Sequence, residues 1–203
     1  MSRPRGSAAP AARSCDARGA VSARETHRVE IEGVERDLPL FEVAPGLRIA
    51  VFNLLGDTEI VEAAARALAR RLRDVDHDVL VTAETKSVPL VYELARGLSK
   101  PWVVLRKQYK PYMGDTITAR TDSITTGHEQ TLHLDEKDLP LVAGRRAVLV
   151  DDVISTGSTL DGIRSVVRSA EGEIVAEAAV FTEGDERETE GIVSLGHLPL
   201  FPS

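Results

Sequence analysis

Short apolar runs alternate with longer amphipathic segments along most of this chain. Short, mainly apolar runs occur at 78–83 (DVLVTA), 102–106 (WVVLR), 147–150 (AVLV) and 174–181. Runs of this length and composition are typical of strands that are buried on both faces. They predict four strands of a covered sheet.

The segments between these runs have helical spacing. One helix is expected from Asp57 or Thr58, which can cap it, to Arg73, with one apolar face made by Val61, Ala64, Leu68 and Leu72. Pro89 suits the first turn of a second helix, and a third is expected over 158–169. Strands that alternate with helices predict an α/β fold, in which a parallel central sheet is flanked by helices.

Two segments have a weaker pattern. Residues 28–40 are expected to form a short strand or hairpin. Residues 107–130 are polar and lack an apolar period, which predicts a long flexible loop, and 131–134 then has the alternation of a strand.

The length of 203 residues fits one domain with a small appendage. Residues 1–28, rich in Ala, Arg, Ser, Gly and Pro, are expected to be a disordered tail, which leaves 29–203 as the domain. The tail has no apolar core of a secretory signal, and the chain has no apolar run long enough to cross a membrane. A cytoplasmic location is therefore expected, with no membrane partner.

Composition excludes several further classes of protein. Cys15 is the single cysteine, so no internal disulfide framework is possible, and no Cys/His cluster has zinc spacing. The net charge of −7 argues against a nucleic-acid partner. Within this acidic chain, residues 86–110 carry six cationic side chains against Glu93 alone, which favours an anion site in that window.

Residues 147–160 carry the most chemical information. The buried strand ends in Asp151 and Asp152, and a loop of small residues then leads into a helix. Free backbone N–H groups at such a helix start bind phosphate, and Gly157 permits a positive φ. Carboxylates at the end of a parallel strand can accept hydrogen bonds from ribose hydroxyls. The segment thus predicts a sugar-phosphate site.

The string VLVDDVISTGSTL (148–160) resembles the phosphoribosyl-pyrophosphate (PRPP) signature of type I phosphoribosyltransferases. The resemblance implies that Asp151 and Asp152 hold the ribose hydroxyls and help to position Mg²⁺ bound to PRPP. It also implies that the 5′-phosphate is cradled by Ser155, Thr156, Gly157, Ser158 and Thr159.

Two basic segments resemble the family's pyrophosphate-binding parts. Val81–Pro89 corresponds to a loop that binds pyrophosphate, often through a non-proline cis peptide, so Lys86 is expected to meet the anion beside the hydroxyls of Thr85 and Ser87. Arg106 and Lys107 resemble the Arg-Lys pair before the family's flexible catalytic loop, and both are expected to stabilise pyrophosphate.

Residues 38–57 resemble the N-terminal hood of adenine and xanthine phosphoribosyltransferases. The resemblance implies a hood from about 29–57 and 184–203 over a core of about 58–183. Val51 and Phe52 are candidates for packing on the base, although an ordinary core strand explains them equally well.

The resemblance as a whole implies an enzyme that transfers 5-phosphoribose from PRPP to a purine, with Mg²⁺ as cofactor and a homodimer as assembly. Adenine is the favoured base. Thr125-Thr126-Gly127, however, looks more like archaeal-type hypoxanthine/guanine enzymes. Glu129 is close to the position of the glutamate of adenine-specific members but offset, and His128 is a candidate proton donor, although exposed loop side chains are the simpler interpretation of both. Hypoxanthine/guanine, xanthine or orotate enzymes, and a non-catalytic PRPP-sensing regulator, remain alternatives.

Overall fold

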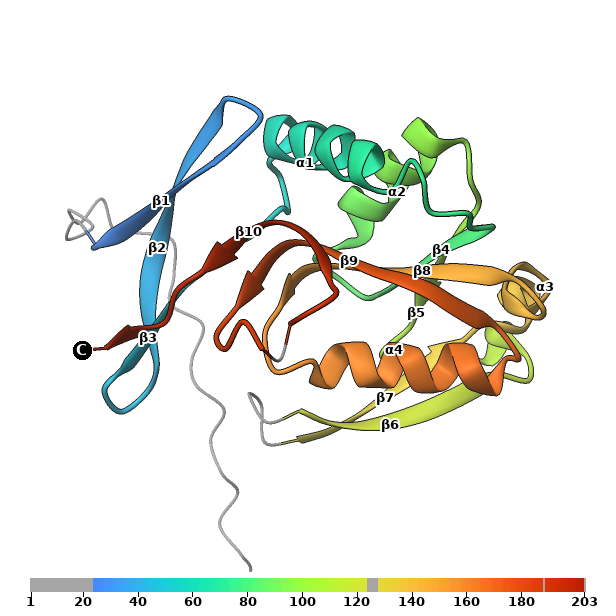
Figure 1. Ribbon diagram of the computed structural model, residues 1–203. Coiled ribbons are helices and arrows are strands. Elements are labelled where there is room, and N and C mark those ends of the chain that lie inside the picture. The colour runs from blue at the N-terminus through green and yellow to red at the C-terminus, as the bar shows by residue number, and fades with distance from the viewer. Residues whose placement is uncertain (1–23, 124–127, 188, 203) are drawn as a thin grey trace, which may run out of the picture.

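The computed structural model describes residues 24–123, 128–187 and 189–202, without the side chains of 121–123 and 128–130 (Figure 1). Most of the predicted disordered tail, including Cys15, and the Thr-Thr-Gly stretch at 125–127 lie outside the described residues.

The centre of the molecule is a five-stranded sheet in which all neighbouring strands are parallel. Its spatial order is β10-β9-β8-β4-β5. The strands are β4 (Val79–Ala83), β5 (Trp102–Leu105), β8 (Arg146–Ile154), β9 (Glu173–Glu183) and β10 (Val193–Leu198). The predicted parallel α/β fold is confirmed.

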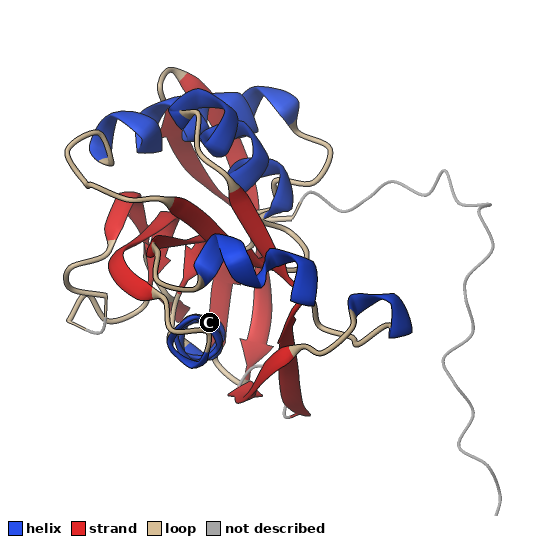
Figure 2. Cartoon of the chain, turned by 90° about the vertical axis from the view of Figure 1, so that its right-hand side faces the viewer, coloured by secondary structure: helices blue, strands red, loops and turns tan. Residues whose placement is uncertain are grey.

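Helices cover both faces of this sheet (Figures 1 and 2). α1 (Thr58–Arg71) and α2 (Val88–Leu98) lie on one face, and α4 (Ser158–Ser169) lies on the other. Successive strand residues alternate between the two: Leu80 and Val148 pack in the core of α1 and α2, whereas Val81 and Leu149 pack in the core that contains the α4 side chains. This alternation explains why the strands are apolar throughout.

A second, antiparallel sheet forms the hood, in the order β1-β2-β3-β11. Its strands are β1 (Thr26–Ile31), β2 (Val34–Ala44), β3 (Leu47–Ala50) and β11 (Phe201–Pro202). Two boundaries differ from the sequence expectation. β1 begins inside the expected tail, and β10, expected to belong to the hood, pairs with β9 in the central sheet.

The segment predicted as a long flexible loop is largely a β-hairpin. β6 (Ile117–Ser123) pairs with β7 (His128–Leu134) beside α4. Ala119, Leu132 and Leu134 are its buried apolar side chains among those described, too few for a clear period in the sequence. Three short elements flank it: the 3-10 helices η1 (Pro111–Met113) and η2 (Glu136–Asp138), and α3 (Leu139–Val142).

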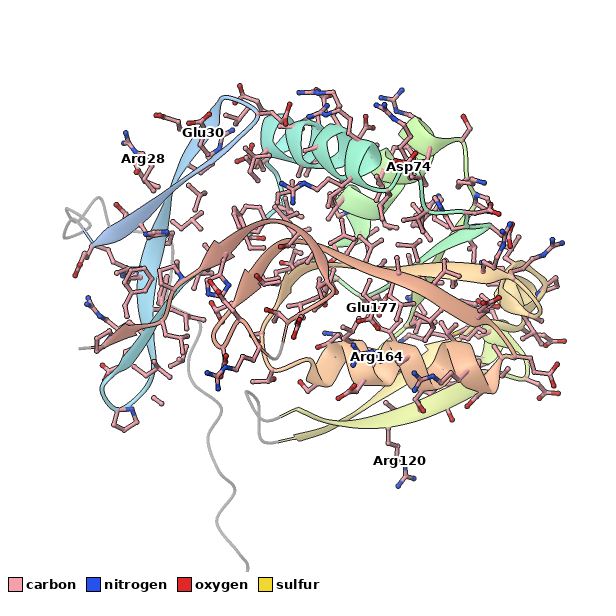
Figure 3. All side chains as sticks on the ribbon, in the orientation of Figure 1. Arg28, Glu30, Asp74, Arg120, Arg164 and Glu177 are labelled. Carbon is pink, nitrogen blue, oxygen red and sulfur yellow. The ribbon has the colours of Figure 1, made fainter. Side chains whose placement is uncertain are left out.

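An ion pair ties α4 to the sheet. Arg164 of α4 donates two hydrogen bonds of 2.5 Å to Glu177 of β9, and Figure 3 shows the two side chains together. In the described part of the chain, no helix is long and apolar enough to cross a membrane.

Candidate functional site

The turn between β8 and α4 forms a small cavity at the carboxyl edge of the sheet. β8 continues through Asp151 and Asp152 to Ile154, and α4 begins at Ser158. Gly157 has a φ of 75°, and no side chain caps the helix start, so the first N–H groups of α4 have no side-chain acceptor. The cavity of about 60 Å³ is lined by Asp151 and 153–160. It is suited to one phosphate group.

Ser87 organises the two carboxylates at this edge. Its hydroxyl donates a hydrogen bond to Asp151 Oδ1 at 2.5 Å. The Ser87 Oγ also accepts the backbone N–H of Asp152 at 2.9 Å. Burial first, and then the neighbouring charge of Asp152, raise the pKa of Asp151 well above its usual range. The acid pair is therefore held in place, and Asp151 holds its negative charge weakly.

Lys86 lies over the same acids. Its ammonium is 2.9 Å from Asp152 Oδ2, while half of its side chain remains exposed. Its charge also acts on Glu183, the last residue of β9, whose pKa is raised by burial and partly lowered again by Lys86. Lys86 is thus both the resting counter-ion of the acids and free on its outer side to meet an anion.

A second network lies in the loop between β4 and α2. The peptide bond between Glu84 and Thr85 is cis, as the family resemblance led us to expect. Glu84 forms an ion pair with Arg106 and accepts the backbone N–H of Lys107 at 3.0 Å. Glu84 therefore fixes the basic pair at the end of β5 against the loop that carries Lys86.

The structure accordingly gathers the predicted residues into two adjoining groups. Asp151, Asp152, Lys86 and Ser87 share direct contacts, with the turn at 155–159 next to them. Arg106 and Lys107 join through Glu84, and Thr85 is exposed beside them.

The predicted base-contacting residues behave differently from one another. Phe52 is 3 % exposed and meets the edge of Phe181 with ring centroids 4.9 Å apart, so it is a core residue in this conformation. Val51 is partly exposed, beyond the end of β3. A contact of either residue with a base stays a prediction.

Sequence reasoning assigned no role to Glu84 or Glu183. Each ends, or directly follows, a strand of the parallel sheet, where ligands bind in such folds. Their position at the carboxyl ends of strands was the signal in the sequence that could have marked them as site residues. A lone carboxylate at a strand end is nevertheless too common to stand out without its spatial neighbours.

A larger cavity, of about 530 Å³, lies at the opposite end of α1 and α2. Helix carboxyl ends such as Gly97 and Leu98 contribute to its wall, and they disfavour anions. Its Lys100 ammonium already donates to the carbonyl of His77 at 2.7 Å. Size alone therefore does not make it the phosphate site.

Comparison with solved structures identifies the fold. An adenine phosphoribosyltransferase from Thermoanaerobacter pseudethanolicus superimposes with a TM-score of 0.63 at 19% sequence identity, covering 85% of this chain and 95% of that one. The enzyme of the same name from Rhodothermus marinus superimposes with a TM-score of 0.60 at 21% sequence identity, covering 85% of this chain and 94% of that one. At such identities the similarity establishes the fold alone.

Sequence relatives include regulators and enzymes. A probable purine biosynthesis transcriptional regulator of Streptococcus pneumoniae is 30% identical over 149 residues, 73% of this chain and 53% of that protein. Adenine phosphoribosyltransferase of Thermosipho africanus is 28% identical over 166 residues, which cover 79% of this chain and 94% of that protein. The chain thus spans about half the length of the regulators that it matches.

The phosphoribosyl transferase domain model matches residues 53–193, which include both networks of the site. The match covers more than half of the chain. The chain therefore belongs to the phosphoribosyltransferase family, and it is a type I member similar to adenine phosphoribosyltransferases.

Proposed function

We propose that this protein transfers 5-phosphoribose from PRPP to a purine base, with adenine as the favoured acceptor, giving a nucleoside monophosphate and pyrophosphate. The observation that carries the proposal is the joint placement of an uncapped helix start, an acid pair and Lys86 at one edge of the sheet. The helix start would bind the phosphate, the acid pair would bind the two ribose hydroxyls, and Lys86 would meet the leaving pyrophosphate.

The binding roles follow from chemistry. N–H groups and hydroxyls of 155–159 hold the 5′-phosphate in the cavity at the start of α4. Asp151 and Asp152 accept hydrogen bonds from the ribose hydroxyls, and binding displaces the present contact of Lys86 with Asp152. Lys86 is then free to turn to the pyrophosphate oxygens.

The difficult step is departure of pyrophosphate, because positive charge builds on the ribose carbon as in glycoside cleavage. Lys86, Arg106 and Lys107 stabilise the separating negative charge. The carboxylates of Asp151 and Asp152 are hard oxygen donors that fit Mg²⁺ shared with PRPP. Among the described residues, no group of three or more metal-ligating side chains is present, so the diphosphate would complete the shell. Mg²⁺ would neutralise charge on the leaving group.

A second candidate function is a PRPP-binding regulator without turnover. It is favoured by the similarity to purine biosynthesis transcriptional regulators, of which this chain covers about half. Hypoxanthine/guanine, xanthine and orotate remain alternative acceptors. The stretch at 125–127 that resembles the hypoxanthine/guanine type lies outside the described part of the chain.

We further propose that the protein acts in the cytoplasm as a homodimer. β5 is one of the two outer strands of the sheet, and Arg106, just past its end, bridges to His133 of β7. The exposed Tyr92 packs on Trp102 of β5, and the exposed Tyr112 lines a surface cavity with Trp102 and Val104. The outer edge of β5, with these aromatic neighbours, is suited to a second copy of the chain.

The deciding experiment supplies PRPP and Mg²⁺ with adenine, hypoxanthine, guanine, xanthine or orotate in separate reactions, and follows pyrophosphate release. We expect the fastest release with adenine. Release with orotate alone would remove the purine assignment. PRPP binding by calorimetry without release for any base would favour the regulator.

The D151N/D152N double variant tests the site itself. It removes the negative charge that the ribose hydroxyls require while keeping side-chain volume, so PRPP binding should be lost and the far-UV spectrum retained. The matched control is D74N, a carboxylate exposed beyond the end of α1 (Figure 3). Unchanged PRPP affinity in the double variant would refute the role of the acids.

A further inference from the structure

Glu183 is a buried carboxyl group that the proposed mechanism does not use. The residue is 8 % exposed, and what remains accessible includes its carboxylate oxygens. It forms no hydrogen bond or ion pair with any residue that the structure describes, and burial raises its pKa. Buried carboxyl groups are costly without a partner, so an unpartnered one is a reason to look for a ligand.

The charged surroundings of Glu183 supply no donor. Lys86, from the loop before α2, acts on Glu183 only through space, because its ammonium contacts Asp152. On β10 the facing residue is Leu198, and the adjacent His197 is engaged through Nδ1 with Thr182 at 3.0 Å. The hydrogen-bonding capacity of Glu183 is therefore free.

The position of Glu183 in the sheet favours contact with the acceptor base rather than with the ribose. Ile154 of β8 pairs with Thr182 of β9, so Glu183 lies next to Ser155, where the phosphate loop begins. On its other side β10 ends opposite Glu183 and continues into β11 of the hood. Figure 1 shows the carboxyl ends of β9 and β10 directed toward the hood. Glu183 thus lies between the turn at 155–159 and the hood.

We propose that Glu183 recognises the acceptor base by accepting a hydrogen bond from an N–H on its six-membered ring. The donor is the exocyclic amine of a 6-aminopurine or the ring N–H of a 6-oxopurine. This inference rests on the proposed function, because it assumes that phosphoribose occupies the loop at 155–159. A base without such a donor leaves the carboxyl group unpartnered, and that loss is the source of selectivity.

The test uses ligands that bind without turnover. Calorimetry compares ribose 5-phosphate, AMP, IMP and purine riboside 5′-monophosphate, which lacks both donors. The wild-type protein should bind AMP or IMP about tenfold or more tightly than purine riboside 5′-monophosphate. In E183L that ratio should fall to near one, with the affinity for ribose 5-phosphate unchanged.

Two further variants separate recognition from folding. E183Q keeps an acceptor oxygen at the same position and should retain part of the ratio. E186Q changes an exposed carboxylate three residues away and should behave as the wild-type protein. Thermal unfolding of E183L and E183Q should occur at or above the wild-type temperature, since a buried, unpaired acid is removed.

The outcomes distinguish the two proposals. A wild-type protein that binds ribose 5-phosphate but prefers no donor-bearing nucleotide overturns the role of Glu183 and leaves the phosphoribose site standing. Equal weakening of ribose 5-phosphate and AMP in E183L, with a lowered unfolding temperature, would show a structural role instead. Failure to bind any of the four ligands or PRPP would overturn both.

Discussion

At the scale of single residues, Ser87 shows how one hydroxyl can serve two functional groups. Its side chain is 1 % exposed, and its oxygen is both the donor to Asp151 and the acceptor for the Asp152 N–H. The resemblance of its loop to the family's pyrophosphate loop led us to expect this hydroxyl at the pyrophosphate, and that contact stays a prediction. In the structure the hydroxyl turns inward, toward acids 64 and 65 positions away.

Replacing Ser87 with alanine should affect both stability and binding. S87A removes the buried hydroxyl that donates to the Asp151 carboxylate, which should lower the free energy of unfolding by about 1–3 kcal/mol, while the Asp152 N–H keeps its contact with Asp151 Oδ1 at 2.9 Å. PRPP affinity should also fall, because the acids lose their orientation. Urea titration and calorimetry measure the two effects. S165A, which removes an exposed hydroxyl from α4, is the control, and equal behaviour of both variants would contradict the role of Ser87.

At the scale of elements, a side chain fixes where β4 and β8 begin. The Asp78 N–H donates to the Arg146 carbonyl at 2.8 Å. The Asp78 carboxylate in turn accepts from the backbone N–H and the guanidinium of Arg146. These hydrogen bonds lower the pKa of Asp78 well below its usual range. They align the amino ends of two neighbouring strands, at the edge opposite the site.

The lowered pKa makes this contribution dependent on pH. The stability it supplies is fully present above the ordinary Asp pKa of about 3.9 and is lost as pH falls through the lower folded-state value. D78N should therefore be less stable than the wild-type protein at pH 7. The difference between the two should shrink below about pH 4. Chemical denaturation across this range measures it, and a gap that is constant with pH would contradict the assignment.

The elements also show how far the pattern of apolar residues can be trusted. The helix capped by Asp57 and the one at 158–169 are confirmed because their burial is decided by local spacing. Of the hairpin of β6 and β7, only the strand at 131–134 was expected, and β6 was missed. One side of the hairpin is covered by α4, so each strand needs few apolar residues, and its pairing is a tertiary contact that the sequence does not display.

At the scale of the whole molecule, ion pairs join the hood to the core. Arg36 of β2 donates to both carboxylate oxygens of Asp57, at 2.6 and 2.8 Å, and to Glu59 at 2.8 Å. Asp57 is also the cap of α1, through the N–H of Ile60. A second pair, Arg70 with Glu32, joins the far end of α1 to the turn between β1 and β2. The hood is thus held along the length of one helix.

Loss of Arg36 should loosen the hood without unfolding the core. In R36M we expect faster amide hydrogen exchange in β1, β2 and β3 and unchanged exchange in β8, because the central sheet keeps its own packing. R28M is the matched control, since Arg28, labelled in Figure 3, pairs with Asp37 and Glu35, which both belong to the hood. Equal exchange in both variants would show that Arg36 does not anchor the hood.

The sequence by itself determined β4, β5, β8 and β9, the helices α1, α2 and α4, and the turn at 155–159 that leads into α4, because each depends on neighbours a few residues apart. Only the tertiary structure placed Ser87 on the acids, Glu84 on Arg106, and Phe52 in the core against Phe181. It also left Glu183 buried between the loop and the hood. These features join segments that are distant in the chain, and burial, which sets their charge and their partners, exists only once the sheet has formed.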